Sequence, residues 1–176
     1  MKSHLMLAIG ALFSCWATLA LAKLEPEVSG LVPQAQIVGT ARLKYFLWNV
    51  YDAKLYTSSG QWRSGEPFAL ELTYLRDLNG DAIAKRSVEE IQKQGFTDEA
   101  VLSNWYRRLI EIIPDVKKGT RLTGVVDANS RTHFFRDGEK VAHLDDPLFS
   151  KWFFNIWLGD STSEPKLRQQ LLGLIK

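Results

Sequence analysis

The amino-acid sequence predicts an α+β fold, in which a mainly antiparallel sheet is covered by helices. Segments with strand-like alternation and segments with helical spacing follow one another in blocks: four strands, two helices, three strands and two helices. Such blocks are typical of an antiparallel sheet with helices packed on it, whereas alternating strand and helix units would predict a parallel sheet. Residues 23–176 have the length of one domain, and no internal repeat divides them.

The first 22 residues are expected to form a secretory signal peptide that is removed from the folded protein. Lys2 gives a basic start, residues 5–13 are apolar, and small residues alternate up to Ala22. Cleavage is expected after Ala22, which predicts a periplasmic or secreted protein. A membrane anchor is disfavoured because Ser14 and Thr18 interrupt a stretch that is short for the ~20 residues of a spanning helix. The mature chain is therefore expected to have no transmembrane span.

Cys15 leaves a second possibility open at this end of the chain. Leu12-Phe13-Ser14-Cys15 resembles a lipoprotein cleavage site, which would tether the protein through Cys15. The bulk of Phe13 and the apolar run beyond Cys15 favour an ordinary signal peptide. Because Cys15 is the only cysteine, residues 23–176 are expected to depend on packing alone, without disulfides or cysteine chemistry.

Composition and short motifs exclude several functions. The chain has 22 Lys and Arg against 20 Asp and Glu, a formal net charge of +2 and no basic run, so no nucleic-acid partner is expected. No phosphate-binding glycine loop and no Gly-x-Ser-x-Gly elbow occurs, and no cofactor is expected. His133 and His143 lack the further ligands of a zinc site and are interpreted as ordinary strand residues. The oligomeric state stays open.

Four β segments are expected in the first half of the chain, after an extended lead-in at residues 23–33. They are residues 34–38, 42–47, 50–57 and 68–75. Trp48 and Asn49 are expected to form the tight connection between the second and the third. The fourth is the clearest half-buried strand, because its large apolar residues alternate from Phe68 to Tyr74.

Helices and a meander follow. A sparse apolar stripe at helical spacing predicts a first helix that ends at Gly95. Thr97 is expected to cap a second helix, which Pro114 stops. Strands are expected at 120–127, 131–136 and 139–144, the last two joined by an Asp-Gly hairpin turn. Asp146-Pro147 predicts the start of a helix whose dense aromatic stripe belongs to the core, and Ser163 is expected to cap a last helix.

Arg42 and Tyr51 are the leading candidates for a ligand-binding pair. They lie on two successive predicted strands, and a guanidinium beside a phenol can hold a carboxylate. Lys44 shares the alternation of Arg42 and would replace it as the anchor if the register slips by one residue. Tyr74 completes the candidate set. A solvated strand face remains the alternative explanation for Arg42 and Lys44.

The sequence from residue 37 to 173 resembles the chalcone isomerase-like family, which includes plant chalcone isomerases, plant fatty-acid-binding proteins and exported bacterial members. The matching motifs are Val50-Tyr51-Asp52-Ala53-Lys54-Leu55-Tyr56, Leu72-Thr73-Tyr74-Leu75-Arg76-Asp77, Phe134-Phe135-Arg136-Asp137-Gly138 and Ile156-Trp157-Leu158-Gly159, with residues 38–42, Phe149, 165–168 and 171–173. The resemblance implies an open-faced β-sandwich with a ligand cleft between its layers.

The resemblance argues against chalcone isomerase activity. Where those enzymes place a tyrosine, an asparagine and a hydroxyl residue, this chain has Ile83, Glu90 and Ile156. Neither isoleucine can donate to the oxygen of an enolate. Fatty-acid-binding relatives are similar in keeping an arginine and a tyrosine on two strands, as Arg42 and Tyr51 do. Glu90 itself, which follows Glu89, is expected on a solvated helix face.

The expected function is therefore an exported, non-enzymatic protein that binds a small apolar carboxylate, such as a fatty acid. Two alternatives stay open. The first is an isomerase or lyase that uses Tyr51 or Tyr74 as the acid and Glu90 as the base, which requires a buried Glu90. The second is an envelope interaction module without a ligand cleft.

Overall fold

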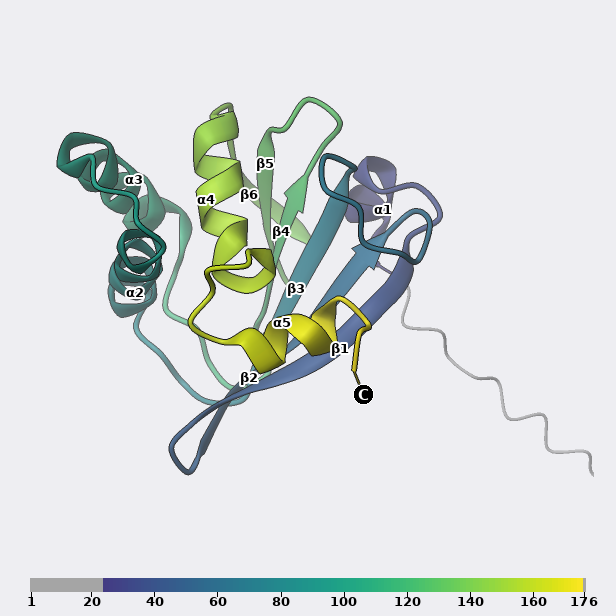
Figure 1. The fold of residues 1–176 in the computed structure, drawn as a ribbon, viewed down its shortest axis with the longest axis horizontal. Coiled ribbons are helices and arrows are strands. Elements are labelled where there is room, and N and C mark those ends of the chain that lie inside the picture. Colours follow the sequence, from purple (N-terminus) through teal and green to yellow (C-terminus); the bar gives the residue numbers. More distant parts are fainter. Residues whose placement is uncertain (1–23, 176) are drawn as a thin grey trace, which may run out of the picture.

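The computed structural model describes residues 24–175, which form one sheet with helices on both of its faces (Figure 1). The predicted α+β class, with an antiparallel sheet covered by helices, is confirmed. The expected leader, with Cys15 and the cleavage point after Ala22, lies outside the described residues. Within residues 24–175, no helix combines the length and the apolar character that crossing a bilayer demands.

Six strands form the sheet in chain order, and each pairs antiparallel with the next. They are β1 (Gln36–Tyr45), β2 (Trp48–Thr57), β3 (Phe68–Tyr74), β4 (Arg121–Val126), β5 (Thr132–Arg136) and β6 (Glu139–Leu144). Successive residues of a strand point to opposite faces. Leu55 and Leu70 lie in the larger core on what we call the front face, and Tyr56 and Ala69 in a smaller cluster on the back face.

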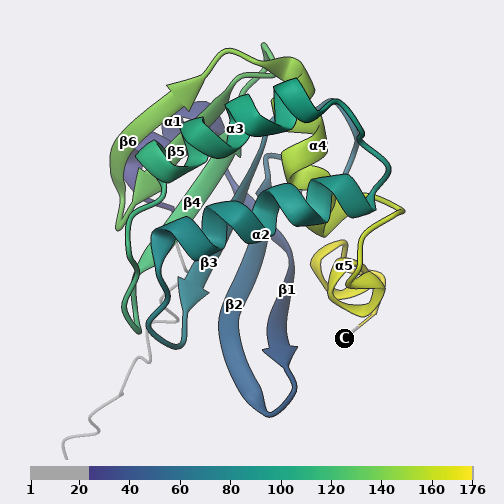
Figure 2. The same cartoon turned by 90° about the vertical axis from the view of Figure 1, so that its left-hand side faces the viewer.

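Four helices cover the front face. They are α2 (Gly80–Lys93), α3 (Glu99–Ile112), α4 (Pro147–Leu158) and α5 (Pro165–Leu171). Figure 2 shows α2 and α3 lying across the sheet, with α4 and α5 toward one side. The short helix α1 (Pro26–Leu31) packs on the back face. The sheet is thus enclosed mainly from one side.

The aromatic stripe of α4 builds much of the front-face core. Asp146 caps this helix by accepting a hydrogen bond from the backbone N–H of Phe149, as the Asp-Pro pair predicts. Phe149 and Phe153 stack at 5.0 Å between ring centroids, and Trp157 packs edge-on against Phe153. Each buried ring of this size contributes roughly 1.5–3 kcal/mol. The predicted core role of the stripe is confirmed.

The expectation of two separate strands at residues 34–38 and 42–47 is wrong, because the single strand β1 covers most of both. It runs without a break, because bulges between Ile37 and Gly39 and between Leu43 and Lys44 absorb two shifts of register. The expected connection at Trp48 and Asn49 is also wrong. Both residues belong to β2, and the turn lies at residues 46–47, where Phe46 adopts a positive φ of 51°.

α1 replaces the extended lead-in expected for residues 23–33. Pro26 stands at its start, where a fixed φ favours the first helical turn. Val28 and Val32 are buried against the back face, and Arg121 of β4 forms an ion pair with Glu25 at 2.7 Å. A helix this short is marginal by itself, so tertiary packing determines it.

The N-terminal cap of α3 also differs from the prediction. Asp98, rather than Thr97, accepts hydrogen bonds from the backbone N–H groups of Ala100 and Val101. The two residues are neighbours, and either type can cap a helix. The local hydrogen bonds therefore start the helix one residue later than the sequence suggested.

Candidate functional site

A cavity of about 390 Å³ lies between the front face of the sheet and helices α2 and α4. This volume falls within the ~300–1,000 Å³ of typical small-molecule sites. Most of its walls are apolar, and the inner part is lined by Leu70, Leu72, Gly124, Phe134, Phe153 and Phe154. A molecule that fills this space must present mainly hydrocarbon to it.

The cavity opens where exposed residues share its lining. They are Tyr45 at the end of β1, Arg76 after β3, Ala82 and Arg86 on α2, and Ser163 and Glu164 before α5. Figure 2 shows the elements that carry these residues: the β1–β2 hairpin, α2 and the segment that leads into α5. Charged groups therefore gather at the opening, while the interior stays apolar.

Tyr51 and Tyr74 stand side by side on the front face and line the cavity. Their Cα atoms are partners in the β2–β3 register, and their ring centroids are 5.9 Å apart. Trp157 donates its indole N–H to the Tyr51 hydroxyl oxygen at 2.9 Å, so the Tyr51 O–H is still able to donate. Burial raises the pKa of both phenols. Both therefore stay protonated and offer donors to a ligand.

Glu90 is buried beside the cavity, so its expected place on a solvated helix face is wrong. Arg86 lies 2.6 Å and Lys93 2.9 Å from its Oε1, and the Ser163 hydroxyl donates to Oε2 at 2.6 Å. Burial would raise the pKa of Glu90, but these partners together lower it. The carboxylate is thus ionised and held. Ser163 was expected to cap the last helix. Its hydrogen bond to Glu90 instead links the segment before α5 to helix α2.

Ile83 of α2 and Ile156 of α4 both line the cavity. They stand where the family resemblance placed a tyrosine and a hydroxyl residue of chalcone isomerases. Their side chains add hydrocarbon surface and no hydrogen-bond donor. The cavity is accordingly more apolar at these two positions than the resemblance to an isomerase alone would suggest.

Arg42 and Lys44 do not line the cavity. Alternation along β1 turns Leu43 toward it and Arg42 toward the back face, and the register pairs Leu43, not Arg42, with Tyr51. Arg42 instead forms a two-pronged ion pair with Asp52, at 2.5 Å for Nε–Oδ1 and 2.8 Å for Nη2–Oδ2. The expectation that Arg42 and Tyr51 face one cleft is therefore wrong. Lys44, exposed beyond the second bulge, does not take its place.

Arg76 is the cation at the cavity that the sequence alone did not single out. It lines the opening, and its guanidinium carbon lies 5.2 Å from the centroid of the Trp48 ring. No carboxylate partner for it occurs within residues 24–175. The sequence does contain a signal for this position, because Arg76 continues the alternation of Leu72 and Tyr74 and so points to the same side of the sheet.

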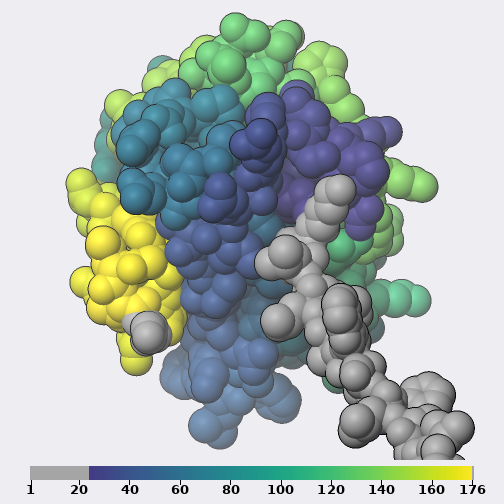
Figure 3. Space-filling model, turned by 90° about the vertical axis from the view of Figure 1, so that its right-hand side faces the viewer, coloured from purple at the N-terminus to yellow at the C-terminus, as the bar shows by residue number. Residues whose placement is uncertain are grey.

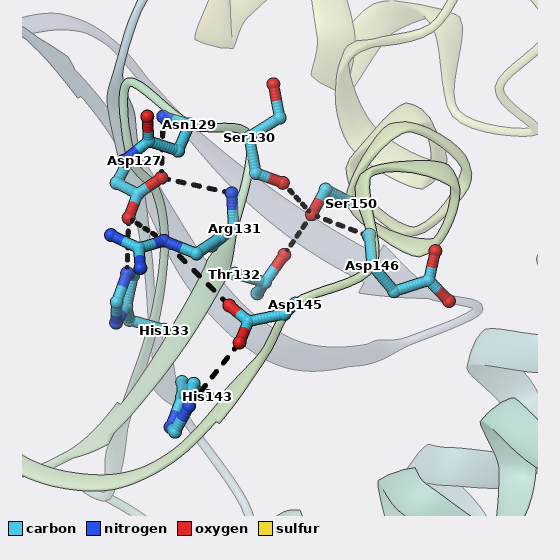
Figure 4. Close-up of polar contacts among 10 residues, drawn as sticks. All are labelled: Asp127, Asn129, Ser130, Arg131, Thr132, His133, His143, Asp145, Asp146 and Ser150. Carbon is cyan, nitrogen blue, oxygen red and sulfur yellow. Dashed lines mark hydrogen bonds and ion pairs between the residues drawn. The ribbon is translucent and has the colours of Figure 1, made fainter.

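A second polar cluster lies outside the cavity, at the turn between β4 and β5 (Figure 4). Asp127 accepts hydrogen bonds from the backbone N–H groups of Asn129 and Arg131 and from Arg131 Nε, and its Oδ2 lies 2.8 Å from His133 Nε2. Burial would raise the pKa of Asp127, but these hydrogen bonds lower it to about 2. His133 also stacks on His143. These contacts brace the turn.

The described residues hold no set of three or more His, Cys, Asp or Glu side chains suited to a metal ion. Metal ions in proteins are held by several such ligands converging on one point. The polar groups that line the cavity are instead the phenols of Tyr45, Tyr51 and Tyr74, the hydroxyl groups of Ser87, Thr123 and Ser163, the carboxylates of Glu90 and Glu164, and the guanidinium groups of Arg76 and Arg86. This set can donate hydrogen bonds to an anionic group at the end of an apolar molecule.

The same sequence pattern and fold occur in known proteins. A sequence model of the family described as chalcone isomerase-like matches residues 34–173. An uncharacterized protein of Haemophilus influenzae is 26% identical over 142 residues, which cover 80% of this chain and 69% of that protein. A crystal structure of a fatty-acid binding protein of Arabidopsis thaliana matches with a TM-score of 0.64 and 11% identity, over 86% of this chain and 96% of that one. At that identity the match shows a shared fold.

Proposed function

This chain belongs to the chalcone isomerase-like family, and we propose that it is a non-enzymatic protein that binds a small apolar carboxylate, such as a fatty acid. The observation that carries the proposal is the cavity itself, whose walls are mostly apolar and whose opening carries the guanidinium group of Arg76 without a carboxylate partner among the described residues. Burying hydrocarbon stabilises by roughly 0.8 kcal/mol per methylene, and a carboxylate needs donors. The Arabidopsis protein is described as fatty-acid binding, which supports the proposal by analogy of fold.

Arg76 takes the role of carboxylate anchor in this proposal, in place of Arg42. Arg86 also lines the opening, but Glu90 at 2.6 Å and Glu89 at 3.8 Å already balance its charge. Arg76 has only the Trp48 ring beside its guanidinium among the described contacts. The carboxylate then lies toward the opening, and the hydrocarbon chain extends into the apolar interior.

Calorimetric titration of laurate into a chain of residues 23–176 tests this assignment. Arg76→Ala is expected to weaken laurate binding about tenfold or more, because a charge-assisted hydrogen bond contributes roughly 1.5–3 kcal/mol. Lauryl alcohol has the same hydrocarbon chain without the charge, so its affinity should hardly change. Ile83→Trp is expected to fill part of the cavity and to weaken both ligands.

Arg42→Ala is the matched control, because it removes the same group from the back face. Laurate binding should match that of the unsubstituted protein. If Arg42→Ala weakens binding and Arg76→Ala does not, the anchor is Arg42 and the ligand lies elsewhere. If no variant matters and mass spectrometry of the gently purified protein finds no lipid, the proposed function fails.

An isomerase or lyase in the same cavity remains the alternative, because the burial of Glu90 is what that hypothesis requires. A general base works best with a pKa near the working pH. The pKa of Glu90 is lowered, and its oxygens are engaged by Arg86, Lys93 and Ser163. A carboxylate held in this way is a weak base, which favours binding over catalysis. An interaction module without a cleft is disfavoured by the cavity.

Export is part of the proposal. Residues 1–22 have the composition of a signal peptide, and removal after Ala22 would deliver the folded domain to the periplasm or the medium. N-terminal sequencing of the exported chain tests this. A first residue at Lys23 is the expected result. A lipid-modified Cys15 at the N-terminus would show the lipoprotein alternative to be correct.

A further inference from the structure

Four successive large apolar side chains stand in solvent where β1 turns into β2, a segment that we call the hairpin tip. The exposed fractions are 60% for Tyr45, 85% for Phe46, 97% for Leu47 and 62% for Trp48. The hairpin projects beyond the rest of the sheet at the lower left of Figure 1, and it forms the lower end of the molecule in Figure 3. Single exposed apolar residues are ordinary, but a contiguous group marks an interaction site.

The chemistry of the hairpin tip suits the boundary of a lipid bilayer. Tyr45 and Phe46 pack edge to face at 4.9 Å between ring centroids, and Arg76 covers one face of Trp48. Trp and Tyr rings concentrate at the level of the lipid headgroups, where one part of the ring is wet and another apolar. Phe46 and Leu47 are the most exposed pair of the tip, and neither carries a polar side-chain atom, so they suit the boundary between headgroups and acyl chains.

Basic residues surround the base of the hairpin. The backbone N–H of Leu75 donates to the Val50 carbonyl at 2.9 Å, and that of Gly119 to the Tyr74 carbonyl at 2.8 Å. These bonds bring the segments after β3 and before β4 to the same end of the sheet. The exposed cations of this end are Lys44, Arg76, Lys117 and Lys118. They complement the negative charge of anionic lipid headgroups.

Two acids of the same segments, Asp77 and Asp115, offset part of this charge. Asp77 accepts a hydrogen bond from the backbone N–H of Lys118, at 2.9 Å. Asp115 accepts one from the backbone N–H of Gly80, at 2.8 Å. Neither acid pairs with a cationic side chain within residues 24–175. Lys44, Arg76, Lys117 and Lys118 still outnumber Asp77 and Asp115 by four charges to two, so these segments carry a net positive charge.

The size of the hairpin tip favours a membrane over a protein partner. Large aromatic side chains offer roughly 150–250 Å² each, so the three partly exposed rings of the hairpin tip, together with Leu47, provide on the order of 600 Å². A stable protein interface takes about 800 Å² from each partner. A narrow, protruding tip also lacks the flat or concave surface that a second copy would have to match.

We infer that the hairpin tip inserts into the headgroup region of an anionic lipid bilayer and holds the cavity opening against it. Tyr45 belongs to the tip and to the opening, and Leu43, Val50 and Arg76 line the cavity just behind it. Membrane docking would thus place the opening where apolar carboxylates partition. The inference itself needs no ligand in the cavity, and its test uses none, so its failure and that of the proposed function are separable.

Sedimentation with vesicles tests the inference. A chain of residues 23–176 keeps every helix, strand and contact described above and lacks the apolar residues 5–13, which would bind lipid by themselves. Binding is expected to vesicles of phosphatidylcholine and phosphatidylglycerol, and to be weaker with phosphatidylcholine alone. Phe46→Ser with Leu47→Ser should weaken binding at least tenfold. Ile110→Ser with Val141→Ser removes two partly exposed apolar side chains elsewhere and should leave binding unchanged.

Brominated lipids provide a second readout, which uses a conservative substitution in the hairpin tip. Their quenching of tryptophan emission should fall when Trp48→Phe removes the one tryptophan of the hairpin tip. The inference is overturned if the unsubstituted chain binds no vesicles, if the tip variant binds as tightly, or if Trp48 is not quenched. It is equally overturned if light scattering shows a dimer that the tip variant dissociates and no vesicle binding occurs.

Discussion

Arg42 and Arg76 carry the same guanidinium group, yet the chain gives them opposite surroundings. Arg42 occupies an outward position of β1, where both oxygens of Asp52 engage it. Arg76 continues the inward alternation of β3, so it reaches the cavity opening without a carboxylate partner among the described residues. An exposed ion pair contributes about 0–1 kcal/mol, so Arg42 matters little to stability. Of these two arginines, Arg76 is the one whose guanidinium group is left free for a ligand carboxylate within residues 24–175.

The lowered pKa of Asp127, at the β4–β5 turn, predicts that the free energy of unfolding falls in acid. Its pKa in the folded protein is about 2, below the ordinary value of 3.8. A lowered pKa stabilises the folded state above pH 3.8, and this contribution is lost as the pH falls through 2. Asp127→Asn should lower the free energy of unfolding by about 1–3 kcal/mol at pH 7. Its difference from the unsubstituted protein should shrink below pH 4, as urea unfolding would show.

Asp145→Asn is the matched control for Asp127, since Asp145 lies in the same cluster but is largely exposed. It should change the free energy of unfolding by less than about 0.5 kcal/mol at either pH. An Asp127→Asn effect of the same size at pH 7 and at pH 2.5 would show that ionisation of Asp127 is not what stabilises the turn.

Strong local patterns were enough to predict most elements, and the misses have physical causes. The alternation of β3 and the capped aromatic stripe of α4 are repeated signals, so both elements were predicted. The bulges of β1 carry no sequence signature, and they merge two expected strands into one. α1 depends on contacts with the back face that are distant in sequence. For the site, alternation predicted that Tyr74 lies on the buried side of its strand, whereas the pairing of Arg42 with Tyr51 depended on a register that one residue decides.

The packing of α5 across β1 makes Gly39 a sensitive position. A Cβ atom at Gly39 would lie 2.1 Å from the Gln170 carbonyl oxygen and 2.5 Å from that of Leu171. Gly39→Ala therefore forces backbone apart and should lower the free energy of unfolding by at least about 1–3 kcal/mol. Hydrogen exchange should also become faster in α5. Urea unfolding with exchange mass spectrometry measures both effects.

Gly30→Ala is the corresponding control, because a Cβ atom there would have no neighbour within 4 Å. Gly30 lies inside α1, where alanine is favoured over glycine by about 1 kcal/mol. The variant should be as stable as the unsubstituted protein or more so. If Gly39→Ala were equally well tolerated, α5 would not rest on β1 as closely as described.

On the scale of the whole molecule, one end gathers the features that concern function. The opening of the cavity, Arg76 and the hairpin tip all lie where β1 turns into β2 and where β3 leads into α2. The opposite face of the sheet carries ion pairs and α1, which close it off. Together, the proposed function and the inferred membrane docking predict that an apolar ligand enters and leaves through this one side of the molecule.

Ligand binding should be visible as a global gain in stability. A ligand that binds only the folded state stabilises it by about 2.7 kcal/mol at a free concentration of 100 times its Kd. In a domain of this size each kcal/mol raises Tm by about 2–4 °C, so laurate at that concentration should raise Tm by about 5–11 °C. Thermal unfolding followed by circular dichroism measures the shift. Arg42→Ala should keep the full shift and Ile83→Trp should lose most of it, because only the second alters the cavity. An equal shift in Ile83→Trp would mean that laurate binds elsewhere on the protein.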